Sequence, residues 1–249
     1  MKNLLVILLL QAAPVTFAQF TGYSVDTVRI NSLILQEDRT ILIYRPVNLK
    51  ADIKLNIIYL LDGENVDYYF HAIQAQPDSN RSDLLAVGIV NTNRRRDMLY
   101  VNGAGKFLKF ITSELEPVME NRFTTGSRIL FGHSFAGAFT IYALLNQPNA
   151  FDGYIASSPA PIMALTNLND YLKTDSTVSR EKILHLSYGS KDMRQVIKWA
   201  RELNDNLTGT EFKHLIWELV VYEDRDHNNT TIPALTDGLD YVLQSSSVH

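Results

Sequence analysis

The 249-residue sequence contains no cysteine. Without thiols the chain can form no disulfide, has no thiol nucleophile and offers no thiolate ligand to a metal. The excess of one charge over the other is small as well, because 23 basic and 27 acidic side chains give a formal net charge of −4. So small an acidic excess gives no support for nucleic-acid binding. Repeats, low-complexity tracts and linkers are also absent from the sequence.

Long apolar runs are nearly absent, and the run at the start of the chain is short. Lys2 supplies a positive charge, Leu4–Leu10 an uninterrupted apolar stretch, and Thr16–Ala18 a small-x-small end. A secretory signal peptide has this form, and the stretch is too short to span a bilayer. We therefore expect residues 1–18 to be removed, which leaves residues 19–249 as one secreted or periplasmic domain with no stable membrane insertion. An uncleaved N-terminal anchor is the alternative.

The apolar pattern predicts an α/β fold. Residues 28–44 alternate in polarity around a polar interruption at 36–38, which indicates an antiparallel hairpin. After that, buried-type strands alternate with stretches of helical spacing, which predicts a mostly parallel sheet with helices on both faces. Ligands of such sheets bind beyond the carboxyl ends of the strands. The predicted strands are 55–61, 84–90, 129–131, 154–156, 183–188 and 215–222, and the predicted helices are 66–73, 105–120, 135–148, 192–207 and 232–243.

The junction around Ser134 is the most informative stretch of the sequence. An apolar strand, Ile129–Phe131, runs into Gly-His-Ser-Phe-Ala-Gly at residues 132–137, and a helix begins at once. This is the layout of a nucleophile elbow, in which a serine on a tight strand-to-helix turn exposes its hydroxyl above the sheet. Ala136 stands where the usual pattern has glycine, and we expect the neighbouring Gly137 to absorb the extra methyl group. The alternative is that these small residues serve packing alone.

A serine nucleophile needs a base, and His227 is the best placed of the six histidines. It lies in a polar loop, residues 223–231, between the last predicted strand and the last predicted helix. Nucleophile, acid and histidine would then follow one another in the order found in α/β-hydrolases. We expect His133 to point away from the nucleophile. The remaining four are interpreted as packing or surface residues: His71, His185, His214 and His249.

Asp192 is the favoured acid, because it follows a predicted buried strand at the edge where the other site loops gather. Such an acid fixes the tautomer of the histidine and stabilises its charged form. A helix N-cap is the alternative role for Asp192. Asp224 and Asp226 are nearer to His227 in the sequence and remain alternative acids, as does a dyad without a strong acid.

Two further loops follow predicted strands and should border the same site. The amide of Glu64, together with that of Phe135, is the candidate oxyanion hole, and Gly63 would permit the necessary turn. An ordinary strand-to-helix turn is the alternative there. The other loop carries Arg95 and Arg96, which are candidates for holding an anionic or hydroxyl-rich acyl group. The alternative for these arginines is a structural cluster of ion pairs.

Nearly the whole of residues 19–249 resembles the esterase family of α/β-hydrolases that contains esterase D-like enzymes, siderophore (enterochelin-type) esterases, feruloyl esterases and mycolyltransferases. The resemblance implies the α/β-hydrolase fold, a Ser134–Asp192–His227 triad and an oxyanion hole formed by the amides of Glu64 and Phe135. Ala136 departs from a family glycine, and the acid of siderophore-esterase-like members is often a glutamate or lies elsewhere. The resemblance rests on residues 58–64, 87–97, 103–111, 132–137, 151–159, 189–192 and the loop around His227.

The sequence therefore predicts a serine carboxylic ester hydrolase that acts through an acyl-serine intermediate, with no metal or organic cofactor. The expected partner is a small-molecule ester of siderophore type, or an aryl or short acyl ester. Ser158, in the matching segment 151–159, is a third candidate for substrate contact beside the two arginines. An acyltransferase with the same triad is the first alternative. A non-catalytic binding protein on a hydrolase scaffold is the second.

Overall fold

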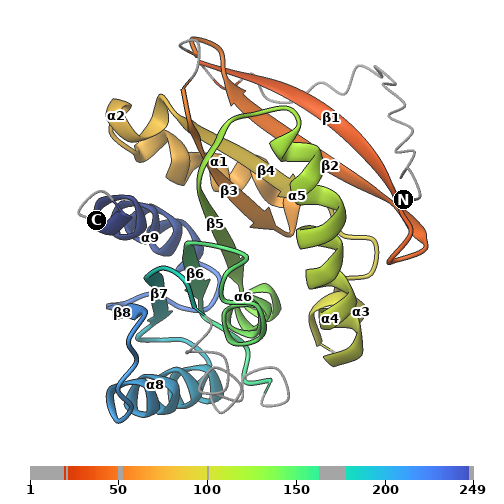
Figure 1. Cartoon of the computed structure of the whole chain (residues 1–249). Helices are drawn as coiled ribbons and strands as arrows, with labels where there is room; N and C mark the ends of the chain where they lie inside the picture. Colours follow the sequence, from red (N-terminus) through yellow and green to blue (C-terminus); the bar gives the residue numbers. More distant parts are fainter. Residues whose placement is uncertain (1–19, 21, 50–52, 100, 163–177, 247–249) are drawn as a thin grey trace.

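The computed structural model describes residues 20, 22–49, 53–99, 101–162 and 178–246 (Figure 1). These residues form one eight-stranded sheet in the order β1-β2-β4-β3-β5-β6-β7-β8. Strand β2 runs antiparallel to β1 and β4, and every other neighbouring pair is parallel. The predicted mixed sheet with an antiparallel N-terminal edge is thus confirmed. The strands are β1 (Tyr23–Ser32), β2 (Glu37–Pro46), β3 (Leu55–Leu61), β4 (Leu84–Ile89), β5 (Thr125–His133), β6 (Gly153–Ser157), β7 (Lys182–Gly189) and β8 (Leu215–Tyr222).

Helices cover both faces of the sheet, as the continuous burial of the central strands requires. On one face α1 packs against α9, and on the other lie α4, α5, α6 and α8 (Figure 1). The helical segments are η1 (Gly63–Asn65), α1 (Val66–Ala75), α2 (Asp78–Arg81), α3 (Arg94–Leu99), α4 (Val101–Phe110), η2 (Ile111–Leu115), α5 (Glu116–Glu120), α6 (Phe135–Asn146), α8 (Arg194–Thr208) and α9 (Thr231–Ser246).

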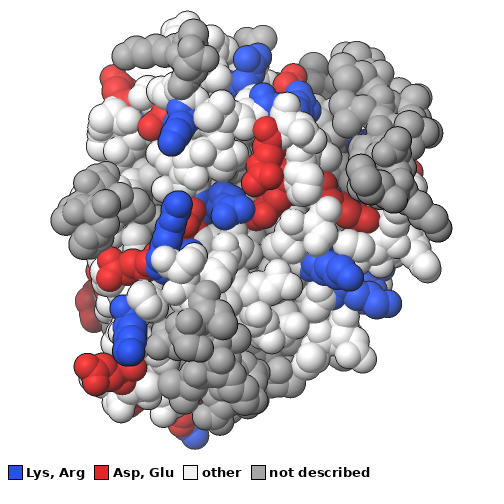
Figure 2. Space-filling view, in the orientation of Figure 1, with Lys and Arg blue, Asp and Glu red and all other residues white. Residues whose placement is uncertain are grey.

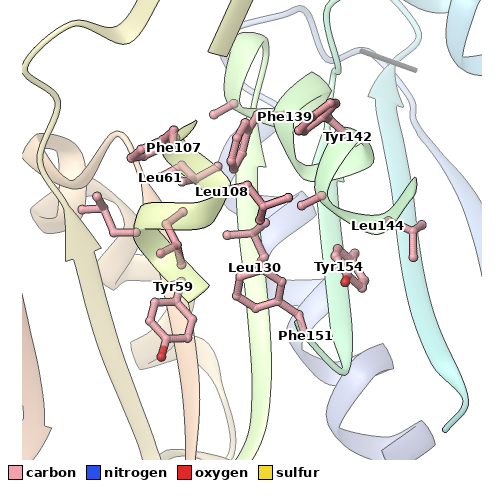
Figure 3. Packing of buried hydrophobic residues seen from close by; sticks show 14 of the residues in the cluster. Tyr59, Leu61, Phe107, Leu108, Leu130, Phe139, Tyr142, Leu144, Phe151 and Tyr154 are labelled. Carbon is pink, nitrogen blue, oxygen red and sulfur yellow. The ribbon is translucent and has the colours of Figure 1, made fainter. Parts of the chain in front are cut away.

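Successive strand residues enter opposite cores, because side chains alternate between the faces of a sheet. Tyr59 and Leu130 belong to the larger core, where they pack with Phe107 and Phe139 of α4 and α6 (Figure 3). Their strand neighbours Ile58, Leu60, Ile129 and Phe131 belong to the second core under α1 and α9. Strand β5 is therefore held from both sides directly below the serine that follows it.

Several elements differ from the predictions, and three of these differences concern the N-terminal half of the chain. The hairpin turn lies at residues 33–36, because the carboxylate of Glu114 accepts hydrogen bonds from the amides of Leu33 (2.9 Å) and Ile34 (3.1 Å). The predicted helix 105–120 begins earlier, at Val101, and passes through the π-helical turn η2 before α5. Helix α3 was not predicted, since its sequence is dominated by charged residues. None of these differences removes a predicted strand.

Basic and acidic side chains are interspersed on the face shown in Figure 2, where the described residues form no large patch of one sign. None of the helices in the described part of the chain combines the length and the apolar character that a membrane span needs. The expected signal peptide, residues 1–18, lies outside the described residues.

Candidate active site

Ser134 occupies the sharp turn between β5 and α6, with φ 59° and ψ −116°. Such a backbone conformation is strained for a residue with a side chain, and strain of this kind clusters at active sites. Close contacts hold it in place. A Cβ on Gly132 would lie 2.2 Å from the carbonyl oxygen of Ala136, and a Cβ on Gly137 would lie 2.9 Å from that of Ser157. Ala136 is buried and its methyl group is accommodated. The close approach of the end of β6 to the helix occurs at Gly137, one residue further along.

A continuous chain of hydrogen bonds links the three residues of the predicted triad. His227 Nε2 lies 3.0 Å from Ser134 Oγ, and His227 Nδ1 lies 2.8 Å from Asp192 Oδ1. An ionised carboxylate can only accept, so Nδ1 carries the proton and Nε2 is free to accept the hydrogen of the serine hydroxyl. The three side chains come from loops after β5, β7 and β8, which end at the same edge of the sheet.

The carboxylate of Asp192 is fully buried and accepts two further hydrogen bonds. Ser158 Oγ donates to Oδ2 at 2.6 Å, and the amide of Met193 donates to Oδ1 at 2.7 Å. Burial alone would raise the pKa of Asp192, but the hydrogen bonds from His227, Ser158 and the Met193 amide outweigh it and lower the pKa. Asp192 is therefore held ionised. The N-cap of α8 is Met193, and no side chain caps that end of the helix, so Asp192 does not fill the alternative N-cap role.

The competing acids lie elsewhere. Asp224 forms an exposed ion pair with Lys191 (2.9 Å), and Asp226 accepts hydrogen bonds from the amides of Asn228 (2.9 Å) and Asn229 (3.1 Å) within its own loop. Neither carboxylate bonds His227.

The expectation that His133 points away from the nucleophile is wrong. Its ring lies beside the His227 ring, with centroids 4.8 Å apart, and its Nδ1 lies 3.1 Å from Ser157 Oγ. His133 is the last residue of β5, and the loop that carries His227 leads into α9, so the two rings meet beyond the end of the strand. By contrast, His185 is buried inside β7 and bonds Glu218 (2.7 Å), which agrees with its expected packing role.

In the loop after β3, the roles of two residues differ from those predicted. Asp62, rather than Gly63, adopts the left-handed conformation, with φ 55°. Gly63 is needed for another reason, because a Cβ there would lie 2.4 Å from the backbone nitrogen of Ile89 in β4. Glu64 follows at an exposed position, where its carboxylate accepts hydrogen bonds from Asn91 N (3.1 Å) and Asn91 Nδ2 (2.7 Å).

The three consecutive arginines of α3 have three different environments. Arg94 bonds Asp62 through two nitrogens (2.6 and 2.7 Å), and its guanidinium lies 5.2 Å from the centre of the Phe135 ring. Arg96 bonds Glu37 (2.8 Å) and Asp97 (2.7 Å), so the alternative of a structural ion-pair cluster describes it better than substrate contact. Arg95 is exposed and forms no ion pair with the described residues.

Ser158 also differs from its predicted role. Its side chain is completely buried, and its hydroxyl lies between Asp192 Oδ2 and Thr230 Oγ1 (3.0 Å). A group enclosed in this way orients the acid and cannot reach a substrate from its present position. Sequence reasoning did not predict this support, nor the partners of Arg94, Asn91 and Thr230, because each of these hydrogen bonds joins residues distant in the sequence.

Comparison with known proteins places the chain in a family. A sequence profile of the family described as "Putative esterase" matches residues 32–196, which is well over half of the chain. The chain belongs to the Putative esterase family. The match includes Ser134 and Asp192 and ends before the loop that carries His227.

Two curated relatives of the Putative esterase chain are named as siderophore esterases. The siderophore enterobactin esterase of Emericella nidulans is 29% identical over 175 residues, which cover 58% of this chain and 58% of that protein. The siderophore triacetylfusarinine C esterase of Aspergillus fumigatus is 34% identical over 113 residues, 42% of this chain and 38% of that protein. The chain thus matches little more than half of the first relative and less than half of the second.

Solved structures resemble the chain over most of its length. The BES protein of Bacillus cereus superposes with a TM-score of 0.79 over 92% of this chain and 99% of that chain, at 22% identity. An IroE-like serine hydrolase from Shewanella oneidensis gives a TM-score of 0.74 at 26% identity, over 87% of this chain and 79% of that one. The α/β-hydrolase type of fold is therefore shared with these neighbours.

Proposed function

We propose that this Putative esterase family member is a carboxylic ester hydrolase that acts through an acyl-serine intermediate. The single observation that carries the proposal is the hydrogen-bond chain from Ser134 Oγ through His227 to the buried carboxylate of Asp192, at 3.0 and 2.8 Å. A serine hydroxyl becomes a nucleophile when an adjacent, oriented base removes its proton. This arrangement provides both the base and the group that orients it.

In the first half of the reaction, Ser134 Oγ attacks the ester carbonyl carbon while its proton passes to His227 Nε2. The resulting imidazolium is stabilised by Asp192, which stays ionised. The oxyanion of the tetrahedral intermediate is held by the amides of Glu64 and Phe135, since preorganised donors at the start of helices suit such a charge. His227 then protonates the leaving alcohol as the carbon–oxygen bond breaks, and the acyl group remains on Ser134.

In the second half, His227 removes a proton from water, and the resulting hydroxide attacks the acyl-serine carbonyl. Collapse of the second tetrahedral intermediate releases the acid and returns the proton to Ser134 Oγ. Every proton in this cycle moves between substrate, water, Ser134 and His227, so the proposed residues complete the reaction by themselves. An alcohol in place of water would give the acyltransferase reaction.

The proposed substrate is a small-molecule ester of siderophore type, with aryl and short acyl esters as the second class. Support comes from the names of the two curated relatives, which act on siderophores. We further propose that residues 1–18 are a cleaved signal peptide and that residues 19–249 form a single secreted or periplasmic domain. The N-terminal sequence of the protein recovered outside the cytoplasm tests this part.

A substrate panel tests the activity. It contains p-nitrophenyl esters of short and long acids, aryl esters, enterobactin and triacetylfusarinine C, each assayed with the wild type and with Ser134→Ala. We expect turnover that falls by about 10⁴-fold or more in Ser134→Ala, since removing the nucleophile disables the whole unit. A fluorophosphonate should label the wild type once, at Ser134. Turnover that survives in Ser134→Ala, or a wild type inactive on every ester, would refute the proposal.

A further inference from the structure

Arg94 connects two loops that follow different strands of the sheet. Its Nε and Nη2 donate to the two carboxylate oxygens of Asp62, at 2.6 and 2.7 Å, in the loop after β3. Nη2 also donates to the carbonyl oxygen of His133 (3.4 Å), and the guanidinium faces the ring of Phe135 in the elbow after β5. A guanidinium that binds a carboxylate through two parallel hydrogen bonds fixes orientation as well as distance.

The loop that Arg94 holds has little freedom. Asp62 is only 4% exposed and adopts the left-handed conformation, which is unfavourable for a residue with a Cβ and persists only where its surroundings hold it. Its carboxylate is also bonded by Asn91 Nδ2 at 2.6 Å. Gly63 lies against the backbone of β4, so the next amide in the chain, that of Glu64, is placed by the conformation at Asp62.

We propose that Arg94 is a positioning residue that, by clamping Asp62 to the elbow, sets the separation between the Glu64 and Phe135 amides. This inference rests on the proposed function, in which these amides hold the oxyanion. Such donors must come within about 3 Å of the developing charge, and a displacement of about 1 Å can cost on the order of 10²-fold in rate. Arg94 therefore acts on the transition state through Asp62 and makes no contact with the substrate.

The test is a double-mutant cycle with Arg94→Met, Asp62→Asn and the double variant, assayed with p-nitrophenyl acetate, an uncharged ester. Asparagine suits Asp62 because it tolerates the left-handed conformation while it lacks the charge. We expect each single variant to lose about 10²-fold in kcat with KM changed by less than about twofold. The double variant should lose no more than the worse single variant, since both changes break the same clamp.

Two readouts separate positioning from a general structural role. The inhibition constant of a trifluoromethyl ketone, which forms a tetrahedral oxyanion on Ser134, should rise by the same factor as kcat/KM falls. Arg94→Lys should recover only a small part of the loss, since an ammonium cannot form the two parallel hydrogen bonds.

Arg122→Met is the matched control. Arg122 also forms an ion pair with an aspartate, Asp26 (3.3 Å), and also lies over a phenylalanine ring, that of Phe123 (5.7 Å). It precedes β5 and so lies at the opposite edge of the sheet from Ser134. We expect this variant to keep the kcat and the inhibition constant of the wild type.

The outcomes are distinguishable. If the wild type shows no Ser134-dependent turnover, the proposed function fails and the clamp fails with it. Two results with an active wild type would refute only the clamp. One is that the losses of the two single variants add, and the other is that Asp62→Asn stays fully active; in either case Arg94 acts independently of Asp62. Losses that match a reduced fraction of folded protein, with an unchanged inhibition constant, would likewise refute the clamp.

Discussion

His133 packs its imidazole beside that of His227, with the ring centroids 4.8 Å apart and the planes tilted by 46°. Burial, together with the neighbouring His227, lowers the pKa of His133 to about 3. His133 is consequently neutral near neutral pH. A second positive charge therefore does not face His227 when that ring accepts a proton from Ser134 in the proposed mechanism.

The low pKa of His133 predicts a specific acid sensitivity. In the unfolded chain a histidine has a pKa of about 6.5. Below that value His133 binds a proton in the unfolded chain but stays neutral in the folded protein. The free energy of unfolding therefore decreases as the pH falls from about 6.5 towards about 3. We expect His133→Asn to show a smaller loss of unfolding free energy between pH 7.5 and 4.5 than the wild type, measured by urea denaturation.

The groups that face His133 are His227, Asp192 and Arg94, and the variant retains all three. Their contributions therefore cancel in the difference between the two proteins, apart from any change in their own environment. Equal losses of stability in the wild type and in His133→Asn would show that His133 binds a proton in the folded state as readily as in the unfolded one.

The second prediction concerns the acid. Asp192→Asn should lower kcat/KM by about 10⁴-fold, because an amide favours the wrong imidazole tautomer and cannot stabilise the imidazolium. Asp224→Asn and Asp226→Asn should each change it by less than about twofold, since their carboxylates bond Lys191 and backbone amides instead of His227. All three variants are compared on one ester. Equal, mild losses in all three would favour a Ser134–His227 dyad.

Much of the fold could be predicted because its information is local. Each central strand is a short, nearly continuous apolar run, which is typical of strands buried on both faces of a parallel sheet. This pattern can be recognised without knowing the order of the strands in the sheet. The elbow was equally clear, since glycine at 132 is required by contacts with Ala136 and Thr140, both within six residues of Ser134. His227 followed from its polar loop between the last predicted strand and helix, together with the chain order of the triad.

What the sequence could not reveal depends on contacts between distant residues. The hairpin turn is set by Glu114, about 80 residues further along the chain. Three adjacent arginines look equivalent in the sequence, yet Arg94 bonds Asp62 near the site while Arg96 bonds Glu37 away from it. Ser158 was expected to touch the substrate, and only the fold shows its hydroxyl enclosed against Asp192.

The third prediction concerns Glu116 in α5, a buried carboxyl far from the proposed triad. Burial raises its pKa to about 7; Arg128, at 3.2 Å, opposes the rise, and Glu120 and Asp152 reinforce it. The folded pKa thus exceeds the unfolded value, so the stability contributed by the neutral carboxyl is lost as the pH rises through about 7. Glu116→Gln, which cannot ionise, should be more stable than the wild type at pH 8.5.

This advantage should shrink or disappear at pH 5, where the carboxyl of the wild type is protonated in the folded protein. Melting temperatures at the two pH values provide the measurement. Glu120→Gln is the control, because Glu120 is 57% exposed and lies 3.9 Å from the same Arg128. A Glu116→Gln variant that is destabilised at both pH values would mean that the ion pair with Arg128 outweighs the cost of burial.

The last prediction concerns the support of Asp192. Ser158 Oγ donates to Asp192 Oδ2 at 2.6 Å inside a fully buried site. Its removal takes away one of the hydrogen bonds that lower the pKa of Asp192, and the lost bond to a charged group is worth about 1.5–3 kcal/mol. Converted to a change in activation free energy, this loss corresponds to a reduction of kcat/KM by roughly 10- to 100-fold in Ser158→Ala, which is the result that we expect.

Ser187→Ala is the matched control for this change. Ser187 is a buried serine on the neighbouring strand β7, and among the described residues its hydroxyl has no hydrogen-bond partner. Its removal should therefore leave kcat/KM nearly unchanged. Without the Ser158 hydrogen bond the pKa of Asp192 is higher, so its carboxylate is protonated at a higher pH. As the pH is lowered, the Ser158→Ala variant should therefore lose activity at a higher pH than Ser187→Ala. Identical pH–rate profiles for the two variants would show that Ser158 contributes only packing, and that His227 and the Met193 amide suffice to keep Asp192 ionised.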